Sequence, residues 1–187
     1  MALEALEASA APLLRAAAAG DRAAFGALYD RYVDAVYRRV AFKLREPADA
    51  EDVTARVFEK AFRQIAAFRP ERAPFLGWLF TIADRLIIDH YRTRKVTAPL
   101  EAALSIPAPE SVEREVEQRL AVEEMCRAMA QLQERQQDVL LLRFVHGYDV
   151  RESAALLGKS EGAVRVSQHR ALLALRRQLA AIASVPG

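Results

Sequence analysis

The stretch VRESAALLGKSEGAVRVSQHR, residues 150–170, has the pattern of two helices joined by a tight turn. Its first part, Val150 to Leu157, has the length and composition of a short helix. Gly158 follows, and glycine takes the positive φ angle of a tight turn without strain. Ser160 stands where a hydroxyl can cap the next helix by accepting a bond from a free N–H. The stretch therefore predicts a helix-turn-helix.

The second helix of this motif is predicted to have an inner apolar side and an outer basic side. Ala154 is small where two helices must cross closely, and Val164 is apolar where the second must rest on the first. A helix of this kind fits the major groove of DNA, where arginine can bind guanine edges bidentately. The candidate DNA-contacting residues are Lys159, Arg165, Val166, His169, Arg170, Arg176 and Arg177. The alternative is an ordinary helical hairpin with a solvated basic face.

The whole composition favours helices. Hydrophobic residues make up 52% of the 187 residues, glycine occurs only 7 times, and no proline lies between Glu110 and Val185. Alanine and leucine, both strong helix formers, supply much of the apolar share. The single cysteine, Cys126, excludes a disulfide within the chain, which fits a cytoplasmic protein. No apolar run approaches the roughly 20 residues that span a membrane, so membrane insertion is not expected.

We predict an all-α fold of two small helical domains joined by a flexible linker. Residues 1–19 are interpreted as an N-terminal extension or helix, and residues 20–95 as the first domain. That domain is predicted to contain three helices with apolar stripes. The first stripe begins at Phe25, the second follows Asp49 as a candidate N-cap, and the third begins at Phe75, with Pro74 in the first turn of its helix. Residues 96–112 lack helical spacing and carry three prolines, which is typical of a linker, and we assign residues 96–118 to it. The second domain is predicted over residues 119–187, with the helix-turn-helix at its centre.

Charge is unevenly distributed along the chain although its net value is only +2. Residues 49–59 hold four acids and one base, residues 85–95 hold four bases and one acid, and residues 159–177 hold five bases and one acid. Separated patches of this kind indicate one acidic surface that faces a protein and two basic surfaces that suit phosphate.

Three segments resemble a known family, the extracytoplasmic-function (ECF) type of sigma factor within the sigma-70 family. DAEDVTARVFEKAF, residues 49–62, resembles its segment that binds core RNA polymerase. FLGWLFTIADRLIIDHYRTR, residues 75–94, is similar to its promoter-melting and −10 recognition segment. GYDVRESAALLGKSEGAVR, residues 147–165, is similar to its −35-reading helix-turn-helix. The three segments occur in the family's order, and the resemblance covers about residues 20–179.

The resemblance implies a function and its site residues. The chain would bind the clamp helices of core RNA polymerase and direct it to promoter DNA, with sigma region 2 in the first domain and region 4 in the second. Polymerase contacts would come from Asp49, Glu51, Asp52, Val53, Phe58 and Glu59. Contacts to the −10 element would come from Trp78, Arg85, Arg92, Arg94 and Lys95. The basic residues of the helix-turn-helix would contact the −35 element. An anti-sigma factor is implied as a further partner, and no cofactor is.

The chain departs from the family at three places. Ala55 and Arg56 stand where the family often has Gln-Glu, which reverses a charge on the polymerase surface. Asp84 and Arg85 stand where Arg-Asn is frequent. In the recognition helix, Val166 and Ser167 replace residues that are often polar and basic.

Other interpretations stay open at this point. Trp78 and Phe75 could stack on a melted base, but aromatic residues on an apolar stripe are more often core. His90 is interpreted as a surface residue. The three histidines and Cys126 have no close metal-ligand spacing, so no metal site is expected. A helix-turn-helix regulator that does not replace sigma would share the C-terminal motif. An enzyme is not expected, because no phosphate-binding glycine loop, His-Glu-x-x-His or Gly-x-Ser-x-Gly motif is present.

Overall fold

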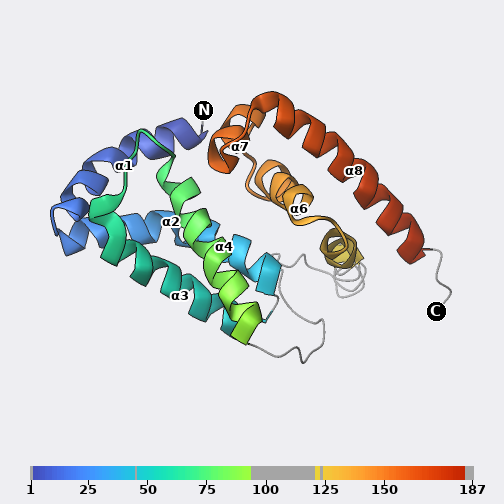
Figure 1. Cartoon of the computed structure of the whole chain (residues 1–187), viewed down its shortest axis with the longest axis horizontal. Coiled ribbons are helices and arrows are strands. Elements are labelled where there is room, and N and C mark those ends of the chain that lie inside the picture. Colours follow the sequence, from blue (N-terminus) through green and yellow to red (C-terminus); the bar gives the residue numbers. More distant parts are fainter. Residues whose placement is uncertain (1, 45, 94–120, 123, 184–187) are drawn as a thin grey trace, which may run out of the picture. The chain divides into compact units, whose positions relative to one another are not determined.

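The computed structural model describes residues 2–44, 46–93, 121–122 and 124–183, and these form helices and connecting turns without a strand. The chain divides into two compact units. The first contains helices α1 to α4, drawn from blue to green in Figure 1. The second contains α6, η2, α8 and residues 150–154 of α7. The predicted all-α fold is thus confirmed. The residues predicted as a linker, 96–118, lie outside the described part of the chain.

Four helices and one 3-10 turn build the first unit. They are α1 (Ala2–Ala18), α2 (Arg22–Leu44), α3 (Pro47–Gln64), η1 (Ile65–Ala67) and α4 (Phe75–Thr93). Helices α2, α3 and α4 contact one another pairwise, and α1 contacts α2 and η1. The segment interpreted as an extension is therefore a helix that packs on the first unit, with Leu3, Ala10, Leu14 and Ala17 buried.

The starts of α2 and α3 follow from local chemistry. Asp21 caps α2, since its Oδ1 accepts hydrogen bonds from the N–H groups of Ala23 (2.8 Å) and Ala24 (3.1 Å). The predicted N-cap at Asp49 is wrong, because the N-cap of α3 is Glu46, three residues earlier, and Pro47 is the first residue of the helix. Proline suits this position because its missing N–H would have no helical partner there. Asp49 is therefore inside the first turn of α3.

Most residues of the predicted apolar stripes lie in the core of the first unit, whereas Tyr29 and Phe62 are 39% and 40% exposed. Leu28, Tyr32, Val36 and Val40 of α2 are fully buried. Apolar residues of α3 and α4 are fully buried as well: Val53, Val57 and Ala61 on α3, and Phe75, Leu76 and Leu79 on α4. Burial of these side chains removes apolar surface from water, which is the main favourable term in folding.

The described residues from 124 onward form four helical segments and a π-helical turn. They are a helical stretch over residues 124–130, α6 (Glu134–Leu140), the π-helical turn η2 (Leu141–Val145), α7 (Val150–Leu157) and α8 (Glu161–Ala183). Val139 and Leu142 are fully buried, and α6 packs on α8. Helix α6 starts with a capping box between Gln133 and Gln136.

Candidate nucleic-acid and polymerase interfaces

The helix-turn-helix is confirmed in its geometry. Helix α7 spans Val150–Leu157 as predicted, and Gly158 has a φ of +61°, the left-handed conformation that the turn requires. The Ser160 hydroxyl oxygen accepts a hydrogen bond from the Ala163 N–H at 3.2 Å, so it caps α8. Ala154 and Val164 are both buried, as expected for residues at the helix crossing.

Helix α7 begins with a capping box that the sequence reasoning did not identify. The Asp149 carboxylate accepts a hydrogen bond from the Glu152 N–H at 2.8 Å. In return, the Glu152 carboxylate accepts one from the Asp149 N–H at 2.8 Å. This reciprocal pair satisfies two N–H groups that the helix itself leaves without partners. An acidic residue followed three positions later by glutamate is the signal that could have revealed it.

Arg143, another residue that the sequence reasoning missed, links the loop before α7 to α8. Its Nε donates to Oε1 of Gln168 on α8 at 3.0 Å, and its Nη1 donates to the carbonyl of Tyr148. One guanidinium therefore bonds to two segments 20 residues apart, which fixes α8 relative to the start of α7. Nothing in the local sequence around Arg143 indicates this partner.

Helix α8 has one buried and one exposed face. Val164 and Ala171 are fully buried. At about 100° per residue, the candidate contact residues of α8 occupy a continuous arc of roughly 140° on the opposite side. All of them are exposed: Arg165, Val166, His169, Arg170, Arg176 and Arg177. Lys159, in the turn before the helix, is exposed as well. The structure thus brings the predicted −35 residues together on one surface, which we call the α8 basic face.

One residue of the α8 basic face has an acidic neighbour. Nη2 of Arg165 lies 2.8 Å from Oε2 of Glu161, one turn earlier on the same helix. Both side chains are largely exposed, and exposed pairs of this kind contribute roughly 0–1 kcal/mol. The pair therefore does not prevent Arg165 from turning toward a DNA base.

Helix α4 carries the predicted −10 residues. Trp78 is half-buried, with its ring centroid 5.1 Å from that of Phe68 and 5.6 Å from that of Phe75. Phe75 is fully buried, so it is a core residue, whereas part of Trp78 is open to solvent. Arg85 and Arg92 are exposed. Arg94 and Lys95 lie outside the described residues.

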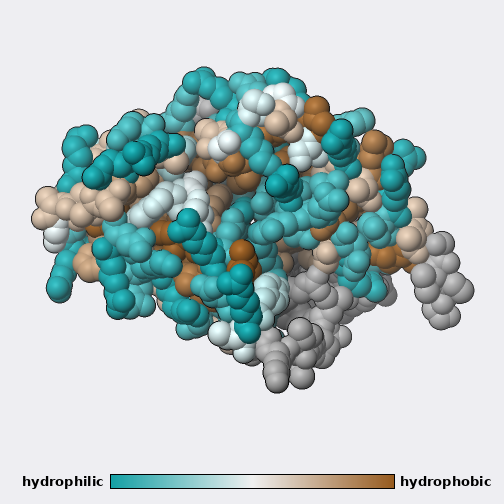
Figure 2. Space-filling model, viewed as in Figure 1, coloured by the Kyte–Doolittle hydropathy of each residue, from teal (hydrophilic) through white to brown (hydrophobic). Residues whose placement is uncertain are grey.

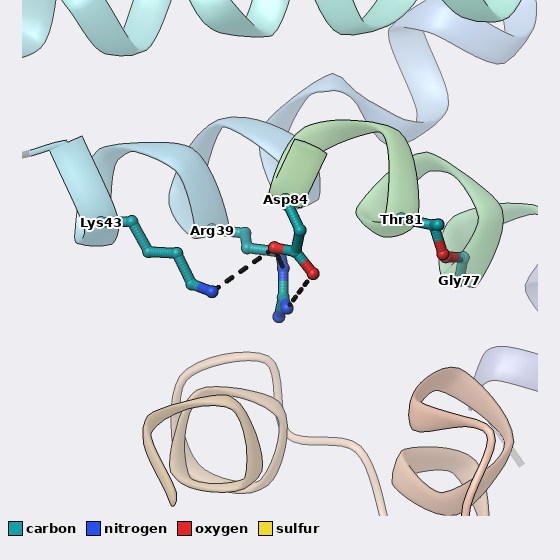
Figure 3. Close-up of polar contacts among 5 residues, drawn as sticks. All are labelled: Arg39, Lys43, Gly77, Thr81 and Asp84. Carbon is teal, nitrogen blue, oxygen red and sulfur yellow. Dashed lines mark hydrogen bonds and ion pairs between the residues drawn. The ribbon is translucent and has the colours of Figure 1, made fainter. Parts of the chain in front are cut away.

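Asp84, where the chain departs from the family pattern, links α4 to α2 (Figure 3). Its two carboxylate oxygens accept hydrogen bonds from Nε (3.1 Å) and Nη2 (2.9 Å) of Arg39. Nζ of Lys43 lies 3.4 Å from Oδ1 of the same carboxylate. The Arg39 guanidinium also lies 4.8 Å from the centre of the Phe80 ring. Asp84 therefore has a structural role between two helices, and its neighbour Arg85 faces solvent.

The face of α3 that was predicted to be acidic is a mixed-charge surface. Nη1 of Arg56 lies 3.7 Å from Oδ2 of Asp52, and Nη2 of Arg63 lies 2.5 Å from Oε1 of Glu59. The two residues of each pair are one helical turn apart. Phe62 lies three residues after Glu59, so the helical spacing places it toward the same side of α3. It is 40% exposed, and its ring packs against that of Phe25 at a centroid distance of 4.9 Å. The surface therefore combines paired charges with one partly open aromatic ring.

The six residues predicted to bind polymerase do not share one surface. Glu51, Asp52 and Glu59 are exposed. Val53 and Phe58 are buried in the core of the first unit, because they lie on the inner side of α3, so they are not surface contacts in this structure. The partly exposed ring of α3 described above was not selected by the sequence reasoning, although it lies on the outer side.

Asp49 is the remaining member of that set, and it has a partner inside the unit. Its Oδ2 lies 3.4 Å from Nε2 of His90 on α4, and the two side chains are only 16% and 14% exposed. The interpretation of His90 as a surface residue is therefore wrong, since it bridges α3 and α4. The charge pattern within the α3 sequence does not indicate that Asp49 contacts a residue of another helix.

Hydrophilic side chains cover much of the visible surface, with apolar groups in smaller areas between them (Figure 2). None of the described helices combines the length and the apolar character needed to cross a lipid bilayer. Within the described ranges, no group of three or more His, Cys, Asp or Glu side chains is arranged to hold a metal ion.

Two family models match the chain in the order of its two units. Sigma-70 region 2 matches residues 28–97, and Sigma-70, region 4 matches residues 123–175. The ECF RNA polymerase sigma factor SigD of Mycobacterium tuberculosis is 32% identical over 175 residues, which cover 88% of this chain and 81% of SigD. The chain belongs to the ECF sigma factors. It is therefore a factor for promoter-specific transcription by RNA polymerase, rather than a regulator that leaves sigma in place. Sigma factors as a class are not enzymes.

Two further similarities agree with this family. The ECF RNA polymerase sigma factor BldN of Streptomyces coelicolor is 36% identical over 170 residues, 89% of this chain, and the chain spans 64% of BldN's length. Among solved structures, CnrH in complex with the cytosolic domain of CnrY is 29% identical. It superposes with a TM-score of 0.66 over 90% of this chain and 96% of CnrH.

Proposed function

We propose that the second unit of this ECF sigma factor reads the −35 element through the α8 basic face. The observation that carries the proposal is the arc of exposed residues opposite the buried Val164 and Ala171. Arg165 and Arg170 contact base edges, with Val166 and His169 beside them. Arg176 and Arg177 lie further along the helix and contact phosphates, which position the helix without reading sequence.

The test is a comparison of variants in reconstituted holoenzyme on a panel of −35 sequences. Replacing a base-reading arginine by alanine should cost about 1–3 kcal/mol and relax preference at one position. We therefore expect Arg165→Ala or Arg170→Ala to change which base is preferred. Glu161→Gln is the matched control, because it removes the charge beside Arg165 without touching the arginine. Unchanged affinity and preference in both arginine variants would contradict this docking.

We propose that the first unit binds core RNA polymerase and captures the −10 element. The exposed side of α3, with Glu51, Asp52, Glu59 and Phe62, is the candidate polymerase surface, where it would meet the clamp helices. On α4, Arg85 and Arg92 hold phosphates of the single strand, and the open part of Trp78 is available to stack on a base. Arg94 and Lys95 belong to the same proposed basic segment. Opening DNA costs a few kcal/mol per unstacked base, and strand binding must offset that cost.

Single-stranded DNA of the non-template −10 sequence tests this assignment. Holoenzyme with Arg92→Ala, Arg94→Ala and Lys95→Ala together should bind this strand less tightly and lose affinity more steeply as salt rises. Binding to a double-stranded −35 probe should remain. Loss of −35 binding with intact strand capture would reverse the roles of the two units.

We infer that the chain is held by an anti-sigma partner in the cytoplasm and that the polymerase supplies the chemistry. CnrH, which is similar to this chain, was solved in complex with the cytosolic domain of CnrY. A tagged copy of the full chain, isolated from unstressed cells of its source, should bring down one stoichiometric protein besides polymerase. Recovery of polymerase alone, with full promoter activity in those cells, would contradict a dedicated inhibitor.

A further inference from the structure

The first residues of α4 are hydrogen-bonded to a side chain of α1, the first helix of the unit in sequence. The Glu7 carboxylate of α1 accepts hydrogen bonds from the N–H groups of Phe75 (2.7 Å) and Leu76 (3.2 Å), the first two residues of α4. The Tyr32 hydroxyl of α2 donates to the same carboxylate at 3.3 Å. Three helices thus meet at one acidic group, 68 residues away in sequence from the helix that it caps.

Helix termini leave their first N–H groups without partners inside the helix. A carboxylate that accepts two of them also complements the positive end of the helix dipole. One of the two capped residues, Phe75, is part of the aromatic cluster that holds Trp78, since its ring centroid lies 5.6 Å from that of Trp78 and 5.3 Å from that of Phe68. The position of Glu7 therefore bears on the position of the one tryptophan proposed to meet DNA.

Helix α1 is held in place by contacts of its own. Arg31 of α2 donates to the Ser9 hydroxyl at 2.9 Å, and Leu3, Ala10 and Leu14 are buried. The Sigma-70 region 2 match begins at residue 28, so α1 lies outside the segment that defines this region. Its contribution to promoter opening does not follow from the family match.

We propose that Glu7 is a positioning residue for −10 capture. By capping α4 it fixes the start of that helix and the orientation of Trp78, so that the strand-binding surface is formed before DNA arrives. The proposal rests on the assignment of α4 to the −10 element. Glu7 itself does not contact DNA in this scheme.

The experiment uses holoenzyme reconstituted with the full chain, and its probes are the single-stranded non-template −10 oligonucleotide and a double-stranded −35 fragment. We expect Glu7→Ala to weaken oligonucleotide binding about tenfold, on the scale of lost hydrogen bonds to a charged group. Affinity for core polymerase and for the −35 fragment should be unchanged. Glu7→Gln should recover part of the loss, because its amide oxygen can still accept one N–H bond while its NH2 group cannot accept.

Two controls separate positioning from general instability. Asp30→Asn changes an exposed acid of the same unit, on α2, and should leave all three affinities unchanged. Trp78 is the only tryptophan in the chain, so its fluorescence reports on the cluster directly. In Glu7→Ala its emission should shift to longer wavelength while core binding persists. If oligonucleotide binding and emission both match the wild type, or if binding to all three partners falls equally, the proposal is wrong.

The proposed role of α4 is tested in the same assay with Arg85→Ala and Arg92→Ala. If these variants lose oligonucleotide affinity and Glu7→Ala does not, the inference about Glu7 fails and the assignment of α4 stands. If the arginine variants bind as the wild type does, the assignment of α4 fails.

Discussion

Replacing Asp84 by alanine should destabilise the first unit by about 1.5–2 kcal/mol. The substitution removes both acceptors of the Arg39 guanidinium, at 3.1 and 2.9 Å, and the neighbour of Lys43 at 3.4 Å. Hydrogen bonds to charged groups contribute about 1.5–3 kcal/mol, whereas exposed ion pairs contribute about 0–1 kcal/mol. Since the Asp84 side chain is 33% exposed, we place the expected value at the lower end of the range for hydrogen bonds to charged groups.

The measurement is urea unfolding of the full chain followed by tryptophan fluorescence. Trp78 lies in the first unit, so the signal reports the unfolding of that unit. With an m-value of about 1–3 kcal/mol/M, the midpoint should fall by roughly 1 M. Asp84→Asn should cost less than Asp84→Ala, because the amide keeps one acceptor oxygen. Asp34→Ala, an exposed acid on α2, is the control and should change stability by less than about 0.5 kcal/mol.

A double-mutant cycle decides whether the effect belongs to the pair. Arg39→Met and Asp84→Ala, measured singly and together, should give a coupling energy of about 1 kcal/mol or more, as for residues in direct contact. Asp84→Ala within about 0.5 kcal/mol of the wild type would refute the reasoning. So would purely additive costs, because they would show that the interaction in Figure 3 does not stabilise the unit.

Three further outcomes are expected. Gly158→Ala should destabilise the helix-turn-helix by about 1 kcal/mol and weaken −35 binding. An added Cβ meets no atom within 4 Å, so the cost is that of the positive φ alone. Unfolding followed by circular dichroism tests it, and an unchanged midpoint would contradict the turn. Asp49→Asn should lower stability but not the affinity for core polymerase, because Asp49 faces His90; a selective loss of polymerase affinity in a pull-down would instead place it in the interface. The double variant with Arg176→Ala and Arg177→Ala should reduce the slope of log affinity against log salt concentration by about 2 without changing base preference. An altered preference on the −35 panel would show that these residues contact bases.

The sequence predicted the features that depend on neighbours in the chain. The helix-turn-helix follows from Gly158, Ser160 and the apolar spacing around them, all within one short stretch, and the structure confirms it. The three apolar stripes of the first domain also follow from local periodicity. Local signals failed at the start of α3, where Pro47 rather than Asp49 opens the helix. Both residues are acceptable near a helix start, so composition alone did not decide between them.

The sequence did not predict contacts between distant segments. The cap that Glu7 provides for Phe75 and the bridge from Arg143 to Gln168 join residues that no periodicity relates. The acidic stretch on α3 was interpreted from its charge alone. In the structure one of its acids faces His90, and others have arginines one turn away, which a count of charges does not show.

If the α8 basic face reads the −35 element as proposed, the two faces of α8 separate promoter choice from folding. Arg165, Val166, His169 and Arg170 are exposed, while Val164 and Ala171 on the other side hold the helix in the unit. Surface substitutions away from packed contacts usually change stability by less than about 0.5 kcal/mol. The residues proposed to read the −35 element can therefore be exchanged as a set, by natural divergence or in a library, while the scaffold stays folded. A descendant of this protein could acquire a new regulon through a few codons on one face of one helix.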